Sequence, residues 1–173
     1  MDPAAGTGNP HAMGPTKKLD LIDKKLIHYL SKDGRMPVKD LVGELGISNP
    51  TLNSRIRHLL QSGVLKIAGL IDTFKIQDLN MALVAVRVKD DTRLGETLDK
   101  IADLDEVHSV YAVTGQYDIF IEVLIAGGIE SLYSFMSEKL PKLGNIASSE
   151  SFVIMKSKKK WVLLPPKLMN WGE

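Results

Sequence analysis

The sequence contains no cysteine, and this absence removes several kinds of chemistry at once. Disulfide bridges, thiolate metal sites and a cysteine nucleophile are excluded, and a reducing cytoplasm is the location we expect. Long hydrophobic runs are missing as well. No segment approaches the roughly 18 consecutive apolar residues of a membrane-spanning helix, so we expect no membrane partner.

An excess of charge of either sign is also lacking, since the formal net charge is only +1. The chain is therefore not a strongly basic protein as a whole. At 173 residues, with 44% hydrophobic and 25% charged residues, it has the composition of an ordinary globular protein and the length for two small domains. Its histidines at 28, 58 and 108 lack the spacing of metal ligands, so we expect no metal site and no cofactor.

Acidic residues are absent from one long interval, from the residue after Glu44 up to Asp72. Three basic residues, Arg55, Arg57 and Lys66, lie inside this interval. A locally positive surface is therefore expected on a chain that is almost neutral overall. Double-stranded DNA is a partner that such a basic patch attracts.

The same interval has the pattern of two short helices joined by a tight turn. Apolar residues at helical spacing predict a first helix over residues 38–45. Gly46 would end this helix, because glycine readily adopts the positive φ that a helix end requires. Ser48 is suited to cap a second helix, predicted over residues 50–62. This spacing is typical of a helix-turn-helix, although an ordinary helical hairpin with a solvated polar face would show it too.

The second predicted helix has an apolar stripe at Leu52, Ile56, Leu59 and Leu60 and an opposite face of amides, a hydroxyl and a guanidinium. Such groups can read base edges in a major groove. We predict base contacts from Asn49, Asn53, Ser54 and Arg57 and phosphate contacts from Arg55, His58 and Lys66. The predicted DNA-binding residues are Ser48, Asn49, Thr51, Asn53, Ser54, Arg55, Arg57, His58 and Lys66.

The flanking segments favour a complete DNA-binding domain over residues 17–66. Upstream, Asp20 and Asp23 form the start signal of a third helix with its own apolar face. Downstream, residues 63–76 are rich in branched apolar residues and predict a wing strand after Gly63. Three helices and a wing would form a winged helix-turn-helix.

The second half of the chain predicts an α+β fold with the order β-α-β-β-α-β, which defines a ferredoxin-like sandwich. The expected strands cover residues 81–88, 107–113, 117–125 and 146–155, and the expected helices residues 94–104 and 129–140. We divide the chain into a disordered leader or expression scar (1–16), the winged helix-turn-helix (17–66), a linker strand (67–79), the ferredoxin-like domain (80–160) and a tail (161–173).

Two helices cannot cover both faces of a four-stranded sheet. We therefore expect that the helices cannot cover all of the alternating strand residues, which include Val84, Val86, Val110, Ala112, Phe120, Glu122, Phe152 and Ile154. A second copy of the chain is the simplest cover, so we predict a homodimer. Its two reading helices would enter successive major grooves, roughly 34 Å apart, and favour a pseudo-palindromic site.

The sequence is similar to the Lrp/AsnC, or feast/famine, family of prokaryotic transcription regulators. The similarity extends over about residues 17–160. It rests on Leu19-Asp20 with Asp23, Asp33-Gly34-Arg35, Leu41 with Leu45-Gly46-Ile47-Ser48, Arg55-Ile56 with Leu59, Gly63-Val64-Leu65 and the 114–118 loop TGQYD. Departures are Leu60, where an acidic residue is common, and Asn80, near which a glycine is common. The resemblance implies a sequence-specific DNA-binding regulator whose dimers commonly assemble into tetramers or octamers.

The loop at residues 114–118 is a second candidate site. Gly115 would let the backbone approach a ligand, Tyr117 offers a ring and a hydroxyl, and Asp118 could pair with an ammonium group. Turn chemistry alone explains the same residues. The resemblance favours a ligand, because the corresponding loop in the family lines a small-molecule site whose usual effectors are amino acids. It implies effector binding by Gly115, Tyr117 and Asp118, with Ser149 and Ser151 as companions.

Two other functions remain open from the sequence. Siroheme decarboxylases use the same two domains, and His108 and Arg87 are the residues here that could serve a tetrapyrrole. The second open function is that of a protein that coats DNA without sequence preference. We expect a regulator and no enzyme, because base-reading groups dominate the predicted recognition face.

Overall fold

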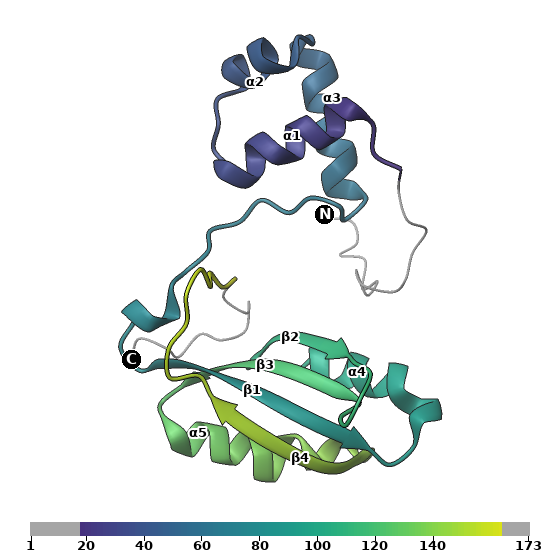
Figure 1. Ribbon diagram of the computed structural model, residues 1–173, viewed down its shortest axis with the longest axis vertical. Coiled ribbons are helices and arrows are strands. Elements are labelled where there is room, and N and C mark those ends of the chain that lie inside the picture. The colour runs from purple at the N-terminus through teal and green to yellow at the C-terminus, as the bar shows by residue number, and fades with distance from the viewer. Residues whose placement is uncertain (1–17, 164–173) are drawn as a thin grey trace, which may run out of the picture. The chain divides into compact units, whose positions relative to one another are not determined.

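The computed structural model describes residues 18–163, which form two compact units that divide between Ala68 and Gly69 (Figure 1). The predicted leader over residues 1–16 and the tail beyond residue 163 lie outside the described residues. None of the helices within residues 18–163 has the length and apolar content that a membrane crossing requires.

The first unit is the predicted three-helix domain, with α1 (Leu21–Lys32), α2 (Val38–Leu45) and α3 (Asn49–Gln61). Gly46 ends α2 with a φ of 64°, a left-handed conformation that glycine adopts without strain. The Ser48 side chain caps α3, as its position before Pro50 predicts. One buried cluster joins the three helices: Leu26, Leu30, Leu41, Leu52 and Leu59.

The predicted wing strand is wrong for the described residues. Residues 64–70 form no strand, and after the Leu65 N–H donates to the Leu59 carbonyl the chain continues without a ladder. The predicted linker strand over residues 67–79 is reduced to a single bridge at Ile71 and a short 3₁₀ turn, Thr73–Lys75. A strand needs a partner for its backbone groups. Within the described part of the first unit no second strand supplies one.

The second unit has the predicted β-α-β-β-α-β order, so the ferredoxin-like fold is confirmed. Its antiparallel sheet has the strand order β2-β3-β1-β4. The strands are β1 (Leu79–Val88), β2 (Val107–Ala112), β3 (Ile119–Ala126) and β4 (Ile146–Val153). The helices are α4 (Leu94–Ala102) and α5 (Ile129–Ser134), and α5 continues as a π turn, Phe135–Lys139.

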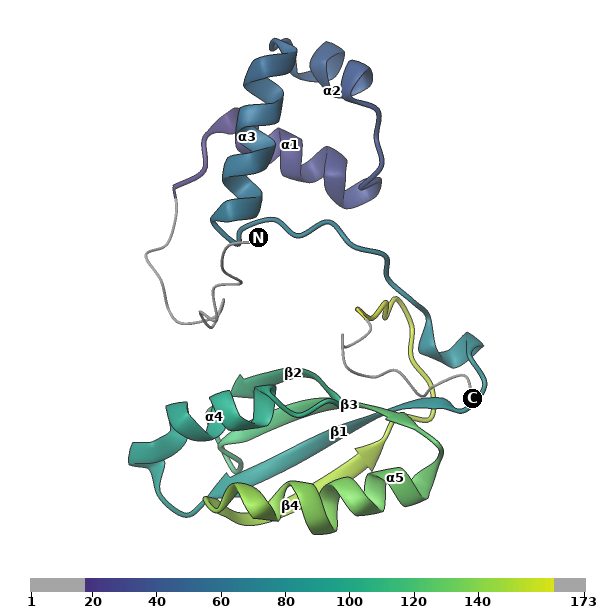
Figure 2. The same cartoon turned by 180° about the vertical axis from the view of Figure 1, so that it is seen from behind.

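Both helices cover the same face of the sheet, as Figure 2 shows. Ile101 of α4 and Phe135 after α5 are fully buried against Val84 and Val86 of β1. These two valines therefore lie on the covered face, and the register places Val110 and Ala112 on the helix side with them. Alternation shows which residues share a face but not which face the helices cover.

The uncovered face consists of the intervening residues of the four strands. Leu83 lies between Glu122 and Phe152, and Phe120 pairs with Tyr111. Phe152 and Tyr111 are 45% and 47% exposed, which is high for aromatic side chains on a sheet. Around these residues the face therefore presents an apolar patch that nothing within residues 18–163 covers.

A short segment after β4, which we name the C-terminal strap (residues 160–163), covers one end of that face. Val162 is fully buried against Met81 and Leu124, and it exchanges two backbone hydrogen bonds of 2.8 and 2.9 Å with Ile71. Figure 1 shows the strap beside the segment that precedes β1. The segment before β1 is thus hydrogen-bonded to the segment after β4.

Candidate functional site

The polar face of α3 is organised by hydrogen bonds within the helix. The Asn53 amide donates to the Asn49 side-chain oxygen at 2.7 Å, and the Ser48 hydroxyl lies 2.9 Å from the Thr51 hydroxyl. The Ser48 oxygen also accepts the Thr51 N–H at 3.4 Å. These four side chains are held in fixed orientations at the start of the helix and remain exposed.

The rest of the predicted DNA-binding set is also exposed, with one exception. Ser54, Arg57, His58 and Lys66 lie on the surface. Within residues 18–163 the Arg57 guanidinium has no hydrogen-bond or ion-pair partner in the chain, so its five N–H donors are available to a ligand. An open hollow beside α3 is lined by Lys18, Asp20, Asp23, Pro50, Thr51, Ser54, Arg55 and His58.

The exception is Arg55, which we expected to hold a phosphate. Its Nη1 donates to Asp20 Oδ2 at 2.7 Å and to Asp23 Oδ1 at 2.8 Å, and its side chain is 27% exposed. These hydrogen bonds raise the pKa of the guanidinium further above its already high value. The structure thus gives Arg55 two acidic partners at the start of α1, the N-cap Asp20 and the helical residue Asp23.

In the second unit the 114–118 loop joins β2 to β3. Gly115 has a φ of 123°, which disfavours any side chain there. The Asp118 carboxylate accepts the Val88 N–H at 2.8 Å, and the Asp118 N–H donates to the Val86 carbonyl. Asp118 therefore ties the loop to β1, and one of its carboxylate oxygens already has a partner.

Tyr117 points onto the uncovered face, where it contacts two charged residues that the sequence analysis did not assign to the effector site. Its hydroxyl donates to the Glu150 carboxylate, and the Arg87 guanidinium lies 5.9 Å from the centre of its ring. The Glu150 hydrogen bond raises the pKa of the Tyr117 hydroxyl. In the sequence, Arg87 and Glu150 could have been noticed as charged residues within predicted strands. Their meeting with Tyr117 depends on strand register.

Ser149 and Ser151 do not join this group. They pair with Val86 and Val84, so they lie on the helix side of β4, whereas Glu150 between them lies on the uncovered side. The structure therefore brings together only part of the predicted effector set in the single chain.

A third polar group surrounds His108 at the C-terminal strap. Its Nδ1 lies 2.9 Å from the Leu163 carbonyl oxygen, and Lys160 Nζ donates to Glu122 Oε1 at 2.7 Å. Burial lowers the pKa of His108, although the Glu122 carboxylate acts in the opposite direction. These contacts attach the strap to the sheet. They place His108 beside the strap, whereas Arg87 lies beside Tyr117, so the two residues considered for a tetrapyrrole do not converge.

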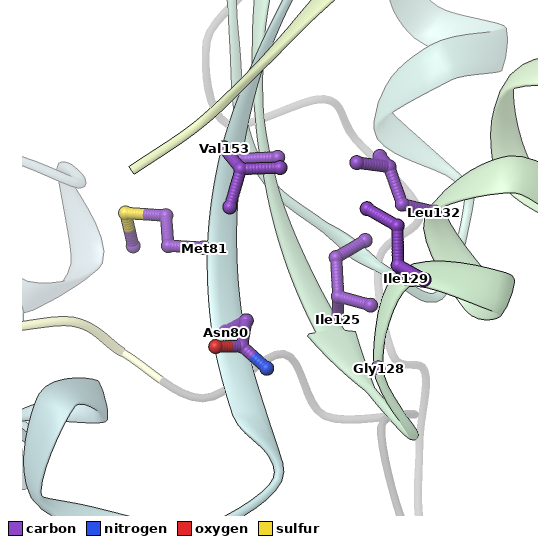
Figure 3. A pocket seen from close by; sticks show the side chains of 8 residues that line it. Asn80, Met81, Ile125, Gly128, Ile129, Leu132 and Val153 are labelled. Atoms are coloured by element: carbon purple, nitrogen blue, oxygen red, sulfur yellow. The ribbon is translucent and has the colours of Figure 1, made fainter. Parts of the chain in front are cut away.

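A small cavity of about 180 Å³ lies between β1, β3, β4 and the start of α5 (Figure 3). Figure 3 shows Ile125, Ile129, Leu132 and Val153 turned toward one another across it, whereas the Met81 side chain points to the other side of β1. Asn80 is polar, but the lining contains no charged side chain. An amino-acid zwitterion needs charged or strongly polar partners, which the group around Tyr117 offers and this cavity does not.

Comparisons with known proteins match both units. A family model described as the Lrp/AsnC ligand binding domain matches residues 81–162, and one described as a winged helix-turn-helix DNA-binding domain matches residues 19–66. An uncharacterized HTH-type transcriptional regulator of Pyrococcus furiosus is 34% identical over 144 residues, covering 83% of this chain and 95% of the relative.

Solved structures agree with these matches. The leucine response regulatory protein of Mycobacterium tuberculosis is 26% identical with a TM-score of 0.72, over 80% of this chain and 94% of that one. A feast or famine regulatory protein from M. tuberculosis, solved in complex with L-methionine, is 26% identical with a TM-score of 0.69, over 81% and 94%.

Proposed function

This chain belongs to the Lrp/AsnC family of transcriptional regulators, and from this premise we propose that it binds pseudo-palindromic DNA as a dimer under the control of an amino-acid effector. The observation that carries the DNA part is the exposed, internally ordered polar face of α3, with Arg57 unpaired within residues 18–163. DNA is the partner, and the cytoplasm is where the protein meets it.

Arg57 reads a base, and its loss alters sequence preference. An Arg57→Ala variant loses about 1–3 kcal/mol of discrimination at one base pair of each half-site, because a guanidinium donates two hydrogen bonds to guanine. Binding-site selection from a random library, run with both proteins, measures the change. An unchanged selected motif contradicts the base contact.

Lys66→Ala is the matched control, since Lys66 is exposed and is proposed to contact phosphate. It weakens binding to all sequences alike, and each lost contact lowers the slope of log affinity against log salt by about 0.9. The selected motif stays the same.

The effector site we propose consists of the 114–118 loop with Arg87 and Glu150. Glu150 accepts the α-ammonium of an amino acid, Arg87 donates to its α-carboxylate, and Tyr117 lies between the two. Gly115 and Asp118 shape the loop. The methionine complex of the M. tuberculosis relative supports an amino acid as the ligand class. Ser149 and Ser151 would take part only from the opposite side of β4.

Removing either charge weakens effector binding. Arg87→Gln and Glu150→Gln each raise the Kd for L-methionine by about tenfold or more, because each loses a hydrogen bond to a charged group. Isothermal titration calorimetry with methionine and leucine measures this. Arg93→Gln is the control, since Arg93 is paired with Glu96 on the exposed surface elsewhere in the unit. Equal loss in all three variants, or none, argues against the assignment.

The two alternatives are tested directly. A tetrapyrrole-binding protein shows a Soret band after mixing with siroheme, and a protein that coats DNA without preference is displaced by excess non-specific duplex in a mobility-shift assay. We expect neither result, because His108 and Arg87 have separate partners and the α3 face carries base-reading groups.

A further inference from the structure

We propose that Arg55 positions the reading helix rather than contacting the DNA. The inference rests on the proposed DNA binding and concerns how α3 is held for it. Arg55 lies on α3, and both of its acidic partners lie at the start of α1. Figures 1 and 2 show α3 crossing α1 near this end.

In each of the two carboxylates, one oxygen takes part in the capping box of α1 and the other accepts a hydrogen bond from Arg55. Asp20 Oδ1 accepts the Asp23 N–H at 2.8 Å, and Asp20 Oδ2 accepts Arg55. Asp23 Oδ2 faces the Asp20 N–H at 3.4 Å, and Asp23 Oδ1 accepts Arg55. One nitrogen of Arg55 thus hydrogen-bonds to both side chains that form the capping box of α1. The cap of one helix and the orientation of another depend on the same three side chains.

Burial and charge favour this positioning role over a phosphate contact. The Asp23 side chain is only 13% exposed, so its carboxylate needs a partner inside the domain. Two carboxylates face one guanidinium, so the group as a whole is negative. A DNA phosphate approaching this group gains little from Arg55, because the acids offset its charge. Arg57, two residues along the helix, carries no such acids.

The apolar core alone leaves α3 some freedom to tilt. Leu52 and Leu59 of α3 are buried with Leu26 and Leu30 of α1, but such contacts have no direction. A hydrogen-bonded ion pair is directional. We therefore expect the reading face to lose its alignment when the Arg55 contacts are removed, while the core keeps the domain folded.

The test uses the full chain with four variants, Arg55→Gln, Asp23→Asn, the double variant and Arg57→Gln. Asparagine at 23 retains an oxygen that can accept the Asp20 N–H, so the change removes mainly the charge. Affinity for a duplex recovered by binding-site selection is measured against salt concentration, at a temperature at which circular dichroism shows every variant folded. Thermal unfolding and hydrogen exchange of the α1 and α3 amides are measured in parallel.

We expect Arg55→Gln and Asp23→Asn each to raise the Kd for DNA about tenfold, with the double variant no worse than either and the salt slope unchanged. The unfolding midpoint of the first unit falls by about 5 °C in each, and the α1 amides exchange faster. Arg57→Gln weakens DNA binding but leaves the midpoint unchanged.

Asp23→Asn distinguishes the two roles most sharply, because it makes the protein more positive. Tighter DNA binding by this variant overturns the proposal, and so does a lower salt slope for Arg55→Gln with an unchanged midpoint. If the unmodified chain binds no duplex, the proposed function fails. Non-additive unfolding midpoints of the single and double variants then still decide whether Arg55 joins α3 to α1.

Discussion

Replacing Phe152 by aspartate should convert the proposed dimer into a monomer and reduce its affinity for a two-half-site duplex by about 100-fold or more. Phe152 is 45% exposed beside Leu83 on the sheet face that neither helix covers. A charge there would have to be desolvated in the proposed dimer interface. A monomer carries one reading helix, so it loses the increase in affinity that a dimer obtains by binding two linked half-sites.

Light scattering after size-exclusion chromatography measures the oligomeric state, and a shift assay with one or two half-sites measures the binding. Tyr133→Asp is the matched control, because Tyr133 is a 72% exposed aromatic residue on α5, in the helix layer. It should leave both measurements unchanged. A Phe152→Asp variant that remains a dimer would show that another surface joins the copies.

The second large effect is expected at Val162, which is fully buried although it lies after the last strand. A Val162→Asp variant should lower the free energy of unfolding of the second unit by about 2–3 kcal/mol. The loss is limited because the strap can detach, which sacrifices the burial of Val162 and its hydrogen bonds to Ile71 but avoids leaving an unpaired charge in the core.

Urea unfolding followed by circular dichroism measures this loss. Met155→Asp introduces the same charge at a residue that is 88% exposed and should change the free energy of unfolding by no more than about 0.5 kcal/mol. Detachment of the strap should also expose the segment around Ile71 to limited proteolysis. Equal stability of the two variants would mean that the strap does not hold this segment in solution.

The elements that the sequence predicted correctly have their signals within a few residues. Gly46 and Ser48 act on the backbone next to them, so the helix-turn-helix could be located to within a residue. The strands of the second unit follow from alternating apolar residues, and their order defines the fold. The wing was predicted from composition alone, and it failed because a strand depends on a partner that composition does not reveal.

Other features depend on contacts between distant residues. Val84 and Leu83 are equally apolar, and only the packing of α4 and α5 decides which of them is covered. Tyr117 meets Glu150 because β1 lies between β3 and β4 in the sheet. Residues 161–163 carry no pattern that predicts a structure, and only the tertiary fold pairs Val162 with Ile71.

The sequence by itself determined the family, the three helices with their turn and the β-α-β-β-α-β order, because caps, turns and periodicity act through neighbouring backbone groups. The tertiary structure decided which side chains share a surface. It assigned Arg55 to Asp20 and Asp23, placed Arg87 and Glu150 beside Tyr117, and left Phe152 uncovered. The physical reason is that a side chain's partners are set by the packing of whole elements, which no local pattern encodes.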